Sequence, residues 1–551
     1  MNLKTLSNTL LTFLLLLILF VSIQSLSNPT FLWNELHYHF ELFDLRGLVK
    51  GSLFLFSYLL AVATFLLIIG IDSFVLFLLS LFIIFIFLAI DFFVQFLGVS
   101  HGFSIDEFRL SMNELGHYDF LFAYGDTIIK ALIGAFIVVL VLFFIRKRVY
   151  RTRFSNWVLG FILLPILFTF LVCYKVDTYK LSSYPAGVKI PAIALEYIRT
   201  KKPMIRRVLD KSIAPTHKAK IKNIIWIIDE SVTGSYLSIN GYPKDSTPFL
   251  KQLDKESNNI SNFGIVNSIS NCSGESNLFL RIGMTPRDSK KVASTMSSLP
   301  TIFQYAKRAG YTTWLFDSQT QKDHLQNYLT LYDKESIDHF ETLGTDVPRP
   351  NKDLTMLHQY AKVINDKNST QKNFIVVVKY GSHFPYLTAY SHNHTRFRPV
   401  LDVAYGGMNL EHKEELINTY LNSIYSSVDL YLKSFVKSID LSETIAFYTS
   451  DHGQNILESK NVTRTHCNSE NVVKNEVSVP FFVFTKDAKK RFPAHKGEYY
   501  SQIQIFPTTL ELLGYDQKLV KEYGRTLATG FSKSSNRHYL LSSSLDEKIY
   551  Q

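Results

Sequence analysis

Apolar residues dominate the first third of the chain, in long runs separated by short polar segments. Five runs are long enough for helices that cross about 30 Å of hydrocarbon, which takes about 20 residues each. They cover 7–24, 50–70, 73–97, 127–145 and 157–175. Because these runs are apolar on every face, they differ from the amphipathic helices of soluble proteins. The pattern predicts an all-α transmembrane domain of about five helices over residues 1–176.

The basic segment RKRVYRTR (146–153) sets the expected orientation of these spans. Basic residues that flank spans stay in the cytoplasm, which places everything after about residue 176 on the opposite side. The first run has an alternative interpretation as a secretory signal peptide. Its apolar core is long and no A-x-A cleavage site follows, which favours a span. Its removal would leave the large domain on the same side.

A basic stretch separates the apolar third from the rest of the chain. Residues 190–211 combine an amphipathic pattern with lysine and arginine, which is typical of a helix on a membrane surface, and a solvated linker is the alternative. We expect residues 177–222 to form this linker. Much of the net charge of +11 lies here and in 146–153, beside the spans, where basic residues act on topology or on anionic lipids. The charge therefore does not predict a nucleic-acid partner.

From residue 223 onward, short β-rich apolar runs alternate with helical stretches. The expected strands are 224–229, 312–317, 374–379 and 444–450. Continuous apolar strands separated by helices predict a mostly parallel sheet covered by helices on both faces. Residues 223–551 are therefore expected to form one α/β domain.

Polar side chains with metal-binding or catalytic chemistry follow each expected strand. They are Asp229, Glu230, Asp317, Lys322, His383, Asp451 and His452. In a parallel sheet, ligands bind outside the carboxyl ends of the strands, so these side chains should lie near one another. Carboxylates with imidazole are the ligand set of catalytic zinc. The sequence predicts a metal site at this edge, with Asp317 as a turn or supporting residue.

The segment SNCSGESNLFLRIGM contains three serines, Ser270, Ser273 and Ser276. A metal makes an alcohol nucleophilic near neutral pH, so one of them is a candidate nucleophile. The residues alone leave open which one. Other histidines are expected on the surface or in loops, namely His324, His339, His392, His394 and His412.

The ordered motifs resemble those of the lipid A phosphoethanolamine transferases, which belong to the alkaline phosphatase/sulfatase superfamily. They are DES (229–231), NGY (240–242), TP (247–248), GSHFP (381–385) and SDHG (450–453). The expected five-span region fits the same family, so the resemblance covers almost the whole chain. It implies a sulfatase-like α/β catalytic domain in the periplasm, anchored in the bacterial inner membrane by several spans.

The resemblance also implies roles for individual residues. The family's nucleophile is a threonine four residues after a cysteine, which selects Ser276, with Ser273 as the second choice. The implied zinc ligands are Glu230, Ser276, Asp451 and His452, and Asp229 is an additional candidate because it replaces a family glycine. Lys322 is expected to hold a phosphate oxygen, and His383 and His466 to contact the substrate head group or a second zinc.

Only three cysteines occur, too few for a disulfide framework. The family partner of Cys272 would fall at Ile282, so that bridge cannot form. Cys467 directly follows His466, and a Cys272–Cys467 bridge outside the cytoplasm is an open expectation. Cys173 lies in an apolar run and is expected to be free. No Cys/Ser-x-Pro-x-Arg segment is present, which argues against a formylglycine sulfatase.

The function that the resemblance implies is zinc-dependent transfer of phosphoethanolamine from phosphatidylethanolamine to lipid A or a surface glycan. The group would pass through a covalent phosphoethanolamine-serine intermediate in a monomeric enzyme. A phosphoglycerol transferase, or a hydrolase of phosphodiesters or sulfate esters, would use the same ligands and is the alternative. A non-catalytic membrane-anchored binding protein is the alternative of another class, and it predicts no metal.

Overall fold

The structure of the protein is a computed structural model of two compact units, Met1–Lys202 and Pro203–Gln551. The described residues are 11–12, 14, 45–96, 125–146, 190–195, 198, 206–285, 299–320, 325–344, 346–366, 368–402, 410–458, 465–468, 472–495, 498–532, 537–541 and 547–550.

The first unit contains three long helices among its described residues. They are α3 (Leu45–Ile69), α4 (Phe74–Phe96) and α7 (Gly125–Ile145). Within α4 and α7, Phe74–Phe93 and Thr127–Ile145 are long and apolar enough to cross a membrane. The spans expected at 7–24 and 157–175 lie outside the described residues, apart from a few positions near the N-terminus. Of the expected linker helix, residues 190–195 and 198 are described, and they are helical.

Close packing and one buried arginine hold these helices together. The Phe92 ring of α4 lies so near Gly134 of α7 that a Cβ there would be 3.1 Å from it. The Arg146 guanidinium, just after α7, donates to the carbonyl oxygens of Ile71 (2.8 Å) and Asp72 (3.2 Å). These carbonyls lie between α3 and α4, where helix ends leave acceptors without intrahelical partners.

The second unit is built on a seven-stranded sheet with the order β2-β7-β6-β1-β5-β3-β4. Its strands are β1 (Asn223–Asp229), β2 (Ile260–Asn267), β3 (Thr312–Asp317), β4 (His339–Thr342), β5 (Asn373–Val378), β6 (Thr444–Ser450) and β7 (Ser478–Phe484). The four strands expected from the sequence are β1, β3, β5 and β6, and they are contiguous and parallel. The expected parallel sheet is confirmed, with β7 antiparallel to both of its neighbours.

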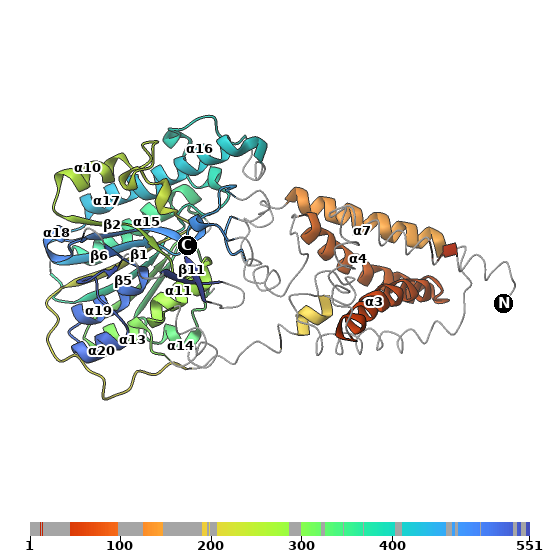
Figure 1. Ribbon diagram of the computed structural model, residues 1–551, viewed down its shortest axis with the longest axis horizontal. Coiled ribbons are helices and arrows are strands. Elements are labelled where there is room, and N and C mark those ends of the chain that lie inside the picture. The colour runs from red at the N-terminus through yellow and green to blue at the C-terminus, as the bar shows by residue number, and fades with distance from the viewer. Residues whose placement is uncertain are drawn as a thin grey trace. The chain divides into compact units, whose positions relative to one another are not determined.

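Helices cover both faces of this sheet (Figure 1). They are α10 (Pro248–Glu256), α11 (Ser273–Ile282), α13 (Ile302–Arg308), α14 (Leu331–Lys334), α15 (Arg349–Ile364), α16 (Lys413–Ile424), α17 (Tyr431–Ser438), α18 (Ala488–Arg491), α19 (Ile505–Leu512) and α20 (Gln517–Glu522). The cores on the two faces are separate: α11, α13, α19 and α20 pack on one, and α10, α15, α16 and α17 on the other. A π-helix, η10 (Tyr425–Leu430), joins α16 to α17.

Shorter elements complete the unit. The strand pairs are β8 (Glu498–Tyr499) with β9 (Phe531–Ser532), and β10 (Arg537–Leu540) with β11 (Glu547–Tyr550). The 3-10 helices are η4 (Gly234–Tyr236), η5 (Ser238–Asn240), η7 (Tyr386–Thr388), η8 (His392–His394), η9 (Leu410–His412), η11 (Lys474–Val477) and η12 (Gln502–Gln504).

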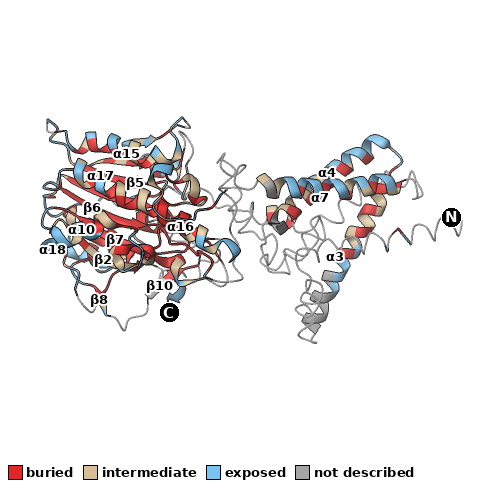
Figure 2. Ribbon diagram, turned by 90° about the horizontal axis from the view of Figure 1, so that it is seen from above, coloured by how far each residue is buried: buried red, intermediate tan, exposed pale blue. Residues whose placement is uncertain are grey.

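The central strands are buried on both faces, which explains why they lack polar alternation. In β1, Ile224, Trp226 and Ile228 enter one core, and Ile225 and Ile227 enter the other. Figure 2 shows the central strands as buried. Each such aliphatic side chain contributes about 1.5–3 kcal/mol by leaving water. The rigid sheet therefore gives its carboxyl edge a fixed geometry.

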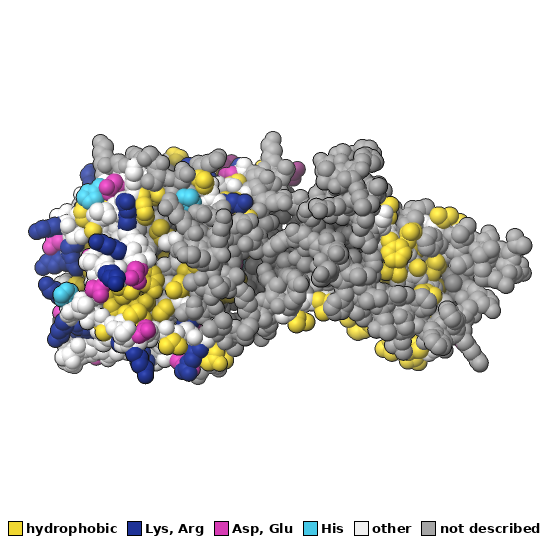
Figure 3. Space-filling model, turned by 60° about the horizontal axis from the view of Figure 1, so that its bottom comes forward, with side chains coloured by type: hydrophobic (Ala, Val, Ile, Leu, Met, Phe, Trp, Pro, Cys, Tyr) yellow, Lys and Arg dark blue, Asp and Glu magenta, His cyan; other side chains and the backbone are white. Residues whose placement is uncertain are grey.

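Charged side chains lie on the surface of this unit as well as in its interior. On the face shown in Figure 3, lysine and arginine side chains are interspersed with acidic and apolar ones. Surface ion pairs also occur in this unit, such as Lys307 Nζ with Asp338 Oδ1 at 2.6 Å.

Candidate metal and nucleophile site

Three expected residues meet at the carboxyl edge of the sheet. Glu230 directly follows β1, and Asp451 and His452 directly follow the neighbouring strand β6. One ligand atom from each lies within 4.8 Å of the others, and all three residues are buried. The three side chains form a cluster that could hold a metal ion, as the sequence predicts.

Backbone contacts fix the direction of the Asp451 carboxylate. Its Oδ1 accepts from the amides of Ser231 (3.1 Å) and His452 (2.7 Å). Its Oδ2 is buried and accepts no hydrogen bond from the described residues. A buried acceptor without a donor is costly, and a cation is one way to satisfy it.

The His452 ring is held in one tautomer. Its Nδ1 lies 2.7 Å from the Gly453 carbonyl, which can only accept, so Nδ1 carries the proton. Nε2 then faces Glu230 Oε1 at 3.3 Å and is the ring atom that could bind a metal. Gly453 must be small, because a Cβ there would lie 1.9 Å from the Asn475 carbonyl oxygen.

The electrostatics of the cluster also suit a cation. Burial raises the pKa of Asp451 well above its usual range, and the Glu230 charge adds to the rise. Burial acts in the same direction on Glu230, but the hydrogen bond and charge of His452 outweigh it and hold that pKa well below the usual range. Burial lowers the pKa of His452, but the Asp451 and Glu230 charges raise it to about 9. Two buried carboxylates in contact need protons or a cation to balance their charge.

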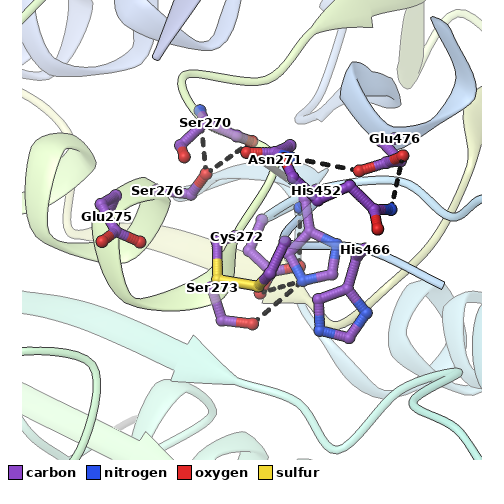
Figure 4. Close-up of a disulfide and its surroundings, with 12 residues drawn as sticks. Ser270, Asn271, Cys272, Ser273, Glu275, Ser276, His452, His466 and Glu476 are labelled. Atoms are coloured by element: carbon purple, nitrogen blue, oxygen red, sulfur yellow. Dashed lines mark hydrogen bonds and ion pairs between the residues drawn. A yellow bond between two sulfur atoms is a disulfide. The ribbon is translucent and has the colours of Figure 1, made fainter. Parts of the chain in front are cut away.

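The serine that reaches this cluster is Ser273. Its Oγ lies 3.2 Å from Glu230 Oε1 and 3.0 Å from His452 Nε2 (Figure 4). Ser273 is the first residue of α11, where the helix dipole favours negative charge on an oxygen. Its hydroxyl thus lies against a carboxylate that can accept its hydrogen bond, at a helix start that suits an alkoxide.

Ser276, which the resemblance selects as nucleophile and ligand, is not brought into the cluster. Its Oγ donates to the Ser270 carbonyl and accepts from the Ser270 amide, both at 3.1 Å. The reason is helical geometry, because Ser276 lies about 4.5 Å further along the α11 axis than Ser273. This geometry favours the second choice, Ser273, and the role of Ser276 as nucleophile stays a prediction from the resemblance.

Two further histidines lie beside the cluster, and their contact with the substrate head group or a second zinc stays a prediction. The His466 ring stacks on the His452 ring with centroids 4.2 Å apart. The His383 ring centroid is 6.0 Å from that of His466, and its charge lowers the pKa of Glu230. Lys322, expected to hold a phosphate oxygen, lies outside the described residues.

Asp229, considered as an additional metal ligand, is occupied elsewhere. Its Oδ2 forms a fully buried ion pair with Lys379 and accepts from the Tyr448 hydroxyl at 2.6 Å. Its Oδ1 accepts from the Glu230 amide at 2.9 Å. Asp229 is therefore not part of the metal-type cluster. It holds the backbone of Glu230 through the hydrogen bond from the Glu230 amide.

One residue that the sequence pattern does not single out contacts the cluster directly. Gln319 Nε2 donates to Glu230 Oε2 (3.0 Å) and to the Lys379 carbonyl (2.7 Å). Gln326 Nε2 in turn donates to Gln319 Oε1 (2.8 Å) and to Asp317. Asp317 is thus a supporting residue, as expected, and burial raises its pKa to about 6. Gln319 comes two residues after β3, so the rule for strand ends identifies it once amide side chains are included.

The Cys272–Cys467 disulfide is present, with Cα atoms 4.7 Å apart. Cys272 precedes Ser273 and Cys467 follows His466, so the bond joins two segments of the site (Figure 4). Ile282 is buried in the core, and Cys173 lies outside the described residues.

The remaining histidines stay away from the cluster, as expected. His339 stacks on Trp314 with centroids 3.8 Å apart, and His394 Nδ1 lies 2.9 Å from Ser426 Oγ. His392 and His412 are exposed, and His324 lies outside the described residues.

Known proteins share this domain. Residues 222–515 match the model of the family described as Sulfatase. The chain is 23% identical over 302 residues to phosphoethanolamine transferase EptC of Escherichia coli. It is 23% identical over 308 residues to Kdo(2)-lipid A phosphoethanolamine 7''-transferase of the same organism. Each match covers 53% of this chain and 51% of the relative, so the chain spans about half the length of these curated relatives.

A solved structure extends the likeness to the first unit. The integral membrane protein lipooligosaccharide phosphoethanolamine transferase A (EptA) of Neisseria meningitidis superposes with a TM-score of 0.61. The alignment covers 94% of this chain and 98% of that one, at 16% identity. At this identity the match shows a shared fold that includes the membrane helices.

Proposed function

The chain belongs to the sulfatase family, and on that premise we propose that it transfers phosphoethanolamine from phosphatidylethanolamine to lipid A or another surface glycan. The names of two relatives, a phosphoethanolamine transferase and a lipid A phosphoethanolamine transferase, support the group that is moved and its acceptor. Both reactants are amphiphiles or lie at a membrane surface, which suits a catalytic domain joined to apolar helices.

The observation that carries the proposal is the position of Ser273. Its hydroxyl lies within hydrogen-bonding distance of both Glu230 and His452, inside a buried metal-type cluster. A binding protein has no need for a nucleophile in this setting, whereas group transfer requires one. We therefore assign Ser273 as the nucleophile.

The residues present fit a zinc ion. Glu230, Asp451, His452 and Ser273 would hold it, since two carboxylates, one imidazole and a hydroxyl oxygen form a typical donor set. A bound zinc would lower the pKa of the hydroxyl and offset negative charge on the phosphoryl oxygens.

In the first step, Ser273 Oγ attacks the phosphorus of the donor lipid. Glu230 Oε1, 3.2 Å away, holds the hydroxyl in place, and the hydroxyl proton passes to the leaving oxygen. The bond from phosphorus to the diacylglycerol oxygen breaks, and that oxygen leaves with a proton as diacylglycerol. Phosphoethanolamine is then bonded to Ser273, and His383 and His466 face the transferred group and offset its charge.

In the second step, an oxygen of the acceptor attacks the same phosphorus. The bond between phosphorus and Ser273 Oγ breaks, and Oγ regains a proton from the attacking group. Lys322 stays a predicted phosphate ligand. We place the enzyme, as a monomer, in the bacterial inner membrane with its catalytic domain in the periplasm, where both reactants are accessible.

Mass spectrometry of the peptide that contains Ser273 tests this proposal. The zinc-loaded protein is incubated with phosphatidylethanolamine vesicles, and a phosphoethanolamine adduct on Ser273 is expected. The Ser273→Ala variant should give none. An adduct on Ser276 would contradict the assignment of the nucleophile, and an adduct only from phosphatidylglycerol would identify a phosphoglycerol transferase. No adduct from either lipid would reject transfer and leave hydrolysis.

A further inference from the structure

We propose that the Cys272–Cys467 disulfide positions His466 against the catalytic cluster, so that transfer depends on the oxidised state of this bond. The inference rests on the proposed function, because it assigns His466 to the substrate side of that site.

The cross-link ties the nucleophile to a histidine from a distant part of the chain. Cys272 is the residue before Ser273, and Cys467 is the residue after His466. The two cysteines are 195 positions apart in the sequence. Figure 4 shows Ser273, His452 and His466 beside the disulfide.

The segment that carries His466 lies outside the regular elements of the fold. Residues 465–468 belong to no helix or strand, and Cys467 has a φ of 56°, which is unfavourable for a residue other than glycine. The Asn455 amide donates to Thr465 O at 2.6 Å, and the Cys467 amide donates to Asn271 O at 2.9 Å. The second of these contacts falls directly beside the disulfide, so the covalent bond and the hydrogen bond hold the same point.

The buried carboxylate of Glu476 adds hydrogen bonds on both sides of the disulfide. Asn271 Nδ2 donates to Asn468 O (2.8 Å) and to Glu476 Oε2 (3.1 Å). Asn468 Nδ2 donates to Glu476 Oε1 at 2.8 Å. Glu476 thus binds Asn271 and Asn468, which flank the two cysteines. We call the disulfide and these hydrogen bonds together the brace.

The sheet does not need this brace to form. Both cysteines lie outside its strands, and the strands next to the site are held by parallel pairing and by the two apolar cores. We therefore expect the reduced protein to stay folded, to keep Glu230, Asp451 and His452 together, and to lose the position of His466.

The bond must be made by an oxidant outside the cytoplasm. The two thiols lose two protons and two electrons to form one disulfide. Oxidised glutathione can accept them and become two glutathione thiols, and a protein disulfide can do the same. Such bonds form and persist in oxidising compartments and are rare in the cytosol. Newly made protein is therefore expected to be inactive until it has been oxidised.

The first test measures transfer to the acceptor in Cys272→Ser, Cys467→Ser and His466→Ala variants of the full-length protein. All carry Cys173→Ser, which removes the third cysteine, and Cys173→Ser alone is the matched control with unchanged activity. We expect each cysteine variant to lower kcat by about tenfold to a hundredfold, since small displacements of a substrate-contacting group have effects of that size. KM should change less, and zinc content and far-UV circular dichroism should stay at the control level.

A double variant separates positioning from a general loss of stability. Adding Cys467→Ser to His466→Ala should reduce kcat by less than about twofold further, because the bond acts through that ring. Fully additive losses, or full activity in the cysteine variants, would overturn the proposal.

A second readout does not depend on activity. Hydrogen exchange of the Cys467 amide, which donates to Asn271 O, should be slow in the oxidised protein. It should accelerate at least about tenfold after dithiothreitol treatment and slow again after oxidised glutathione is added. Unchanged exchange after complete reduction would overturn the brace. Redox-dependent exchange in a protein that forms no Ser273 adduct would reject the proposed function while keeping the brace.

Discussion

The Ser273 hydroxyl oxygen lies 3.0 Å from His452 Nε2, although the two residues are 179 positions apart in the sequence. Ser273 opens a helix and His452 follows a strand, so two rigid elements set this distance. The same hydroxyl is 3.2 Å from Glu230, which follows the neighbouring strand. The hydroxyl that we propose as nucleophile is thus held in place by three elements at the edge of the sheet.

Substitution of the two serines should separate chemistry from stability. Ser273→Ala removes the proposed nucleophile, and we expect transfer to fall at least about a thousandfold with little change in stability. Ser276→Ala leaves the buried Ser270 amide without its acceptor, so the free energy of unfolding should fall by about 1–3 kcal/mol. Transfer rates at saturating donor and urea unfolding measure the two effects. A larger loss of kcat in Ser276→Ala than in Ser273→Ala would contradict the assignment.

Removal of the metal should destabilise the protein as well as inactivate it. Without a cation, the buried Glu230 and Asp451 carboxylates are poorly compensated. At a free zinc concentration about a thousand times the Kd, binding contributes about 4 kcal/mol to stability. A chelator should therefore lower Tm and abolish transfer, and added zinc should restore both. In Glu230→Gln the chelator should shift Tm much less, and an equal shift would argue against Glu230 as a ligand.

The buried Lys379–Asp229 pair should be important for stability. Lys379→Met leaves Asp229 charged and unpaired in the core, which should cost about 3–5 kcal/mol. Adding Asp229→Asn should recover part of this loss. Lys307→Met breaks the half-exposed pair with Asp338 and is the matched control, with an expected cost of at most about 1 kcal/mol. Equal losses in the two single variants, measured by urea unfolding, would contradict the distinction.

Asp429 should make stability depend on pH. Burial raises its pKa from 3.8 to about 6, although it accepts from the Phe249 and Leu250 amides. The folded state therefore holds this proton more tightly than the unfolded state. Its contribution is fully present below about pH 4 and is lost as the pH rises through about 6, by up to about 3 kcal/mol.

The Asp429→Asn variant isolates this effect. Its amide is neutral at every pH, so the stability of the variant relative to the original protein should rise between about pH 4 and about pH 7. Urea unfolding of both proteins across this range measures the difference, in which other titrating groups cancel. A difference that is constant with pH would contradict the assigned pKa.

Much of the sheet and the metal cluster could be predicted from the sequence. Strands β1, β3, β5 and β6 are continuous apolar runs, and Glu230, Asp451 and His452 follow directly from the rule for strand ends. Strand β7 is not predicted, because Pro480 interrupts its pattern. In the sheet Pro480 pairs with Ile265, next to a shift of register in β2, where a missing amide is tolerated.

Other features of the site could not be predicted, because they depend on tertiary structure. The choice between Ser273 and Ser276 depends on where α11 begins, and the sequence pattern does not locate a helix start to within one turn. The same pattern makes Lys379 the last residue of a strand, and its pairing with Asp229 depends on the relative register of β5 and β1. The spacing that suggests Ser276 comes from family resemblance and not from geometry.

The order of strands in the sheet has a consequence for biogenesis. The first strand of the domain to be synthesised is β1, yet it lies between β5 and β6, with Asn223 opposite Asn373 and Thr444. Its pairing partners are therefore made 150 and 221 residues later. Contacts this far apart in sequence make folding slow. Until those partners have been made, β1 must stay unpaired and strongly apolar, so this stretch is where a chaperone would be needed most.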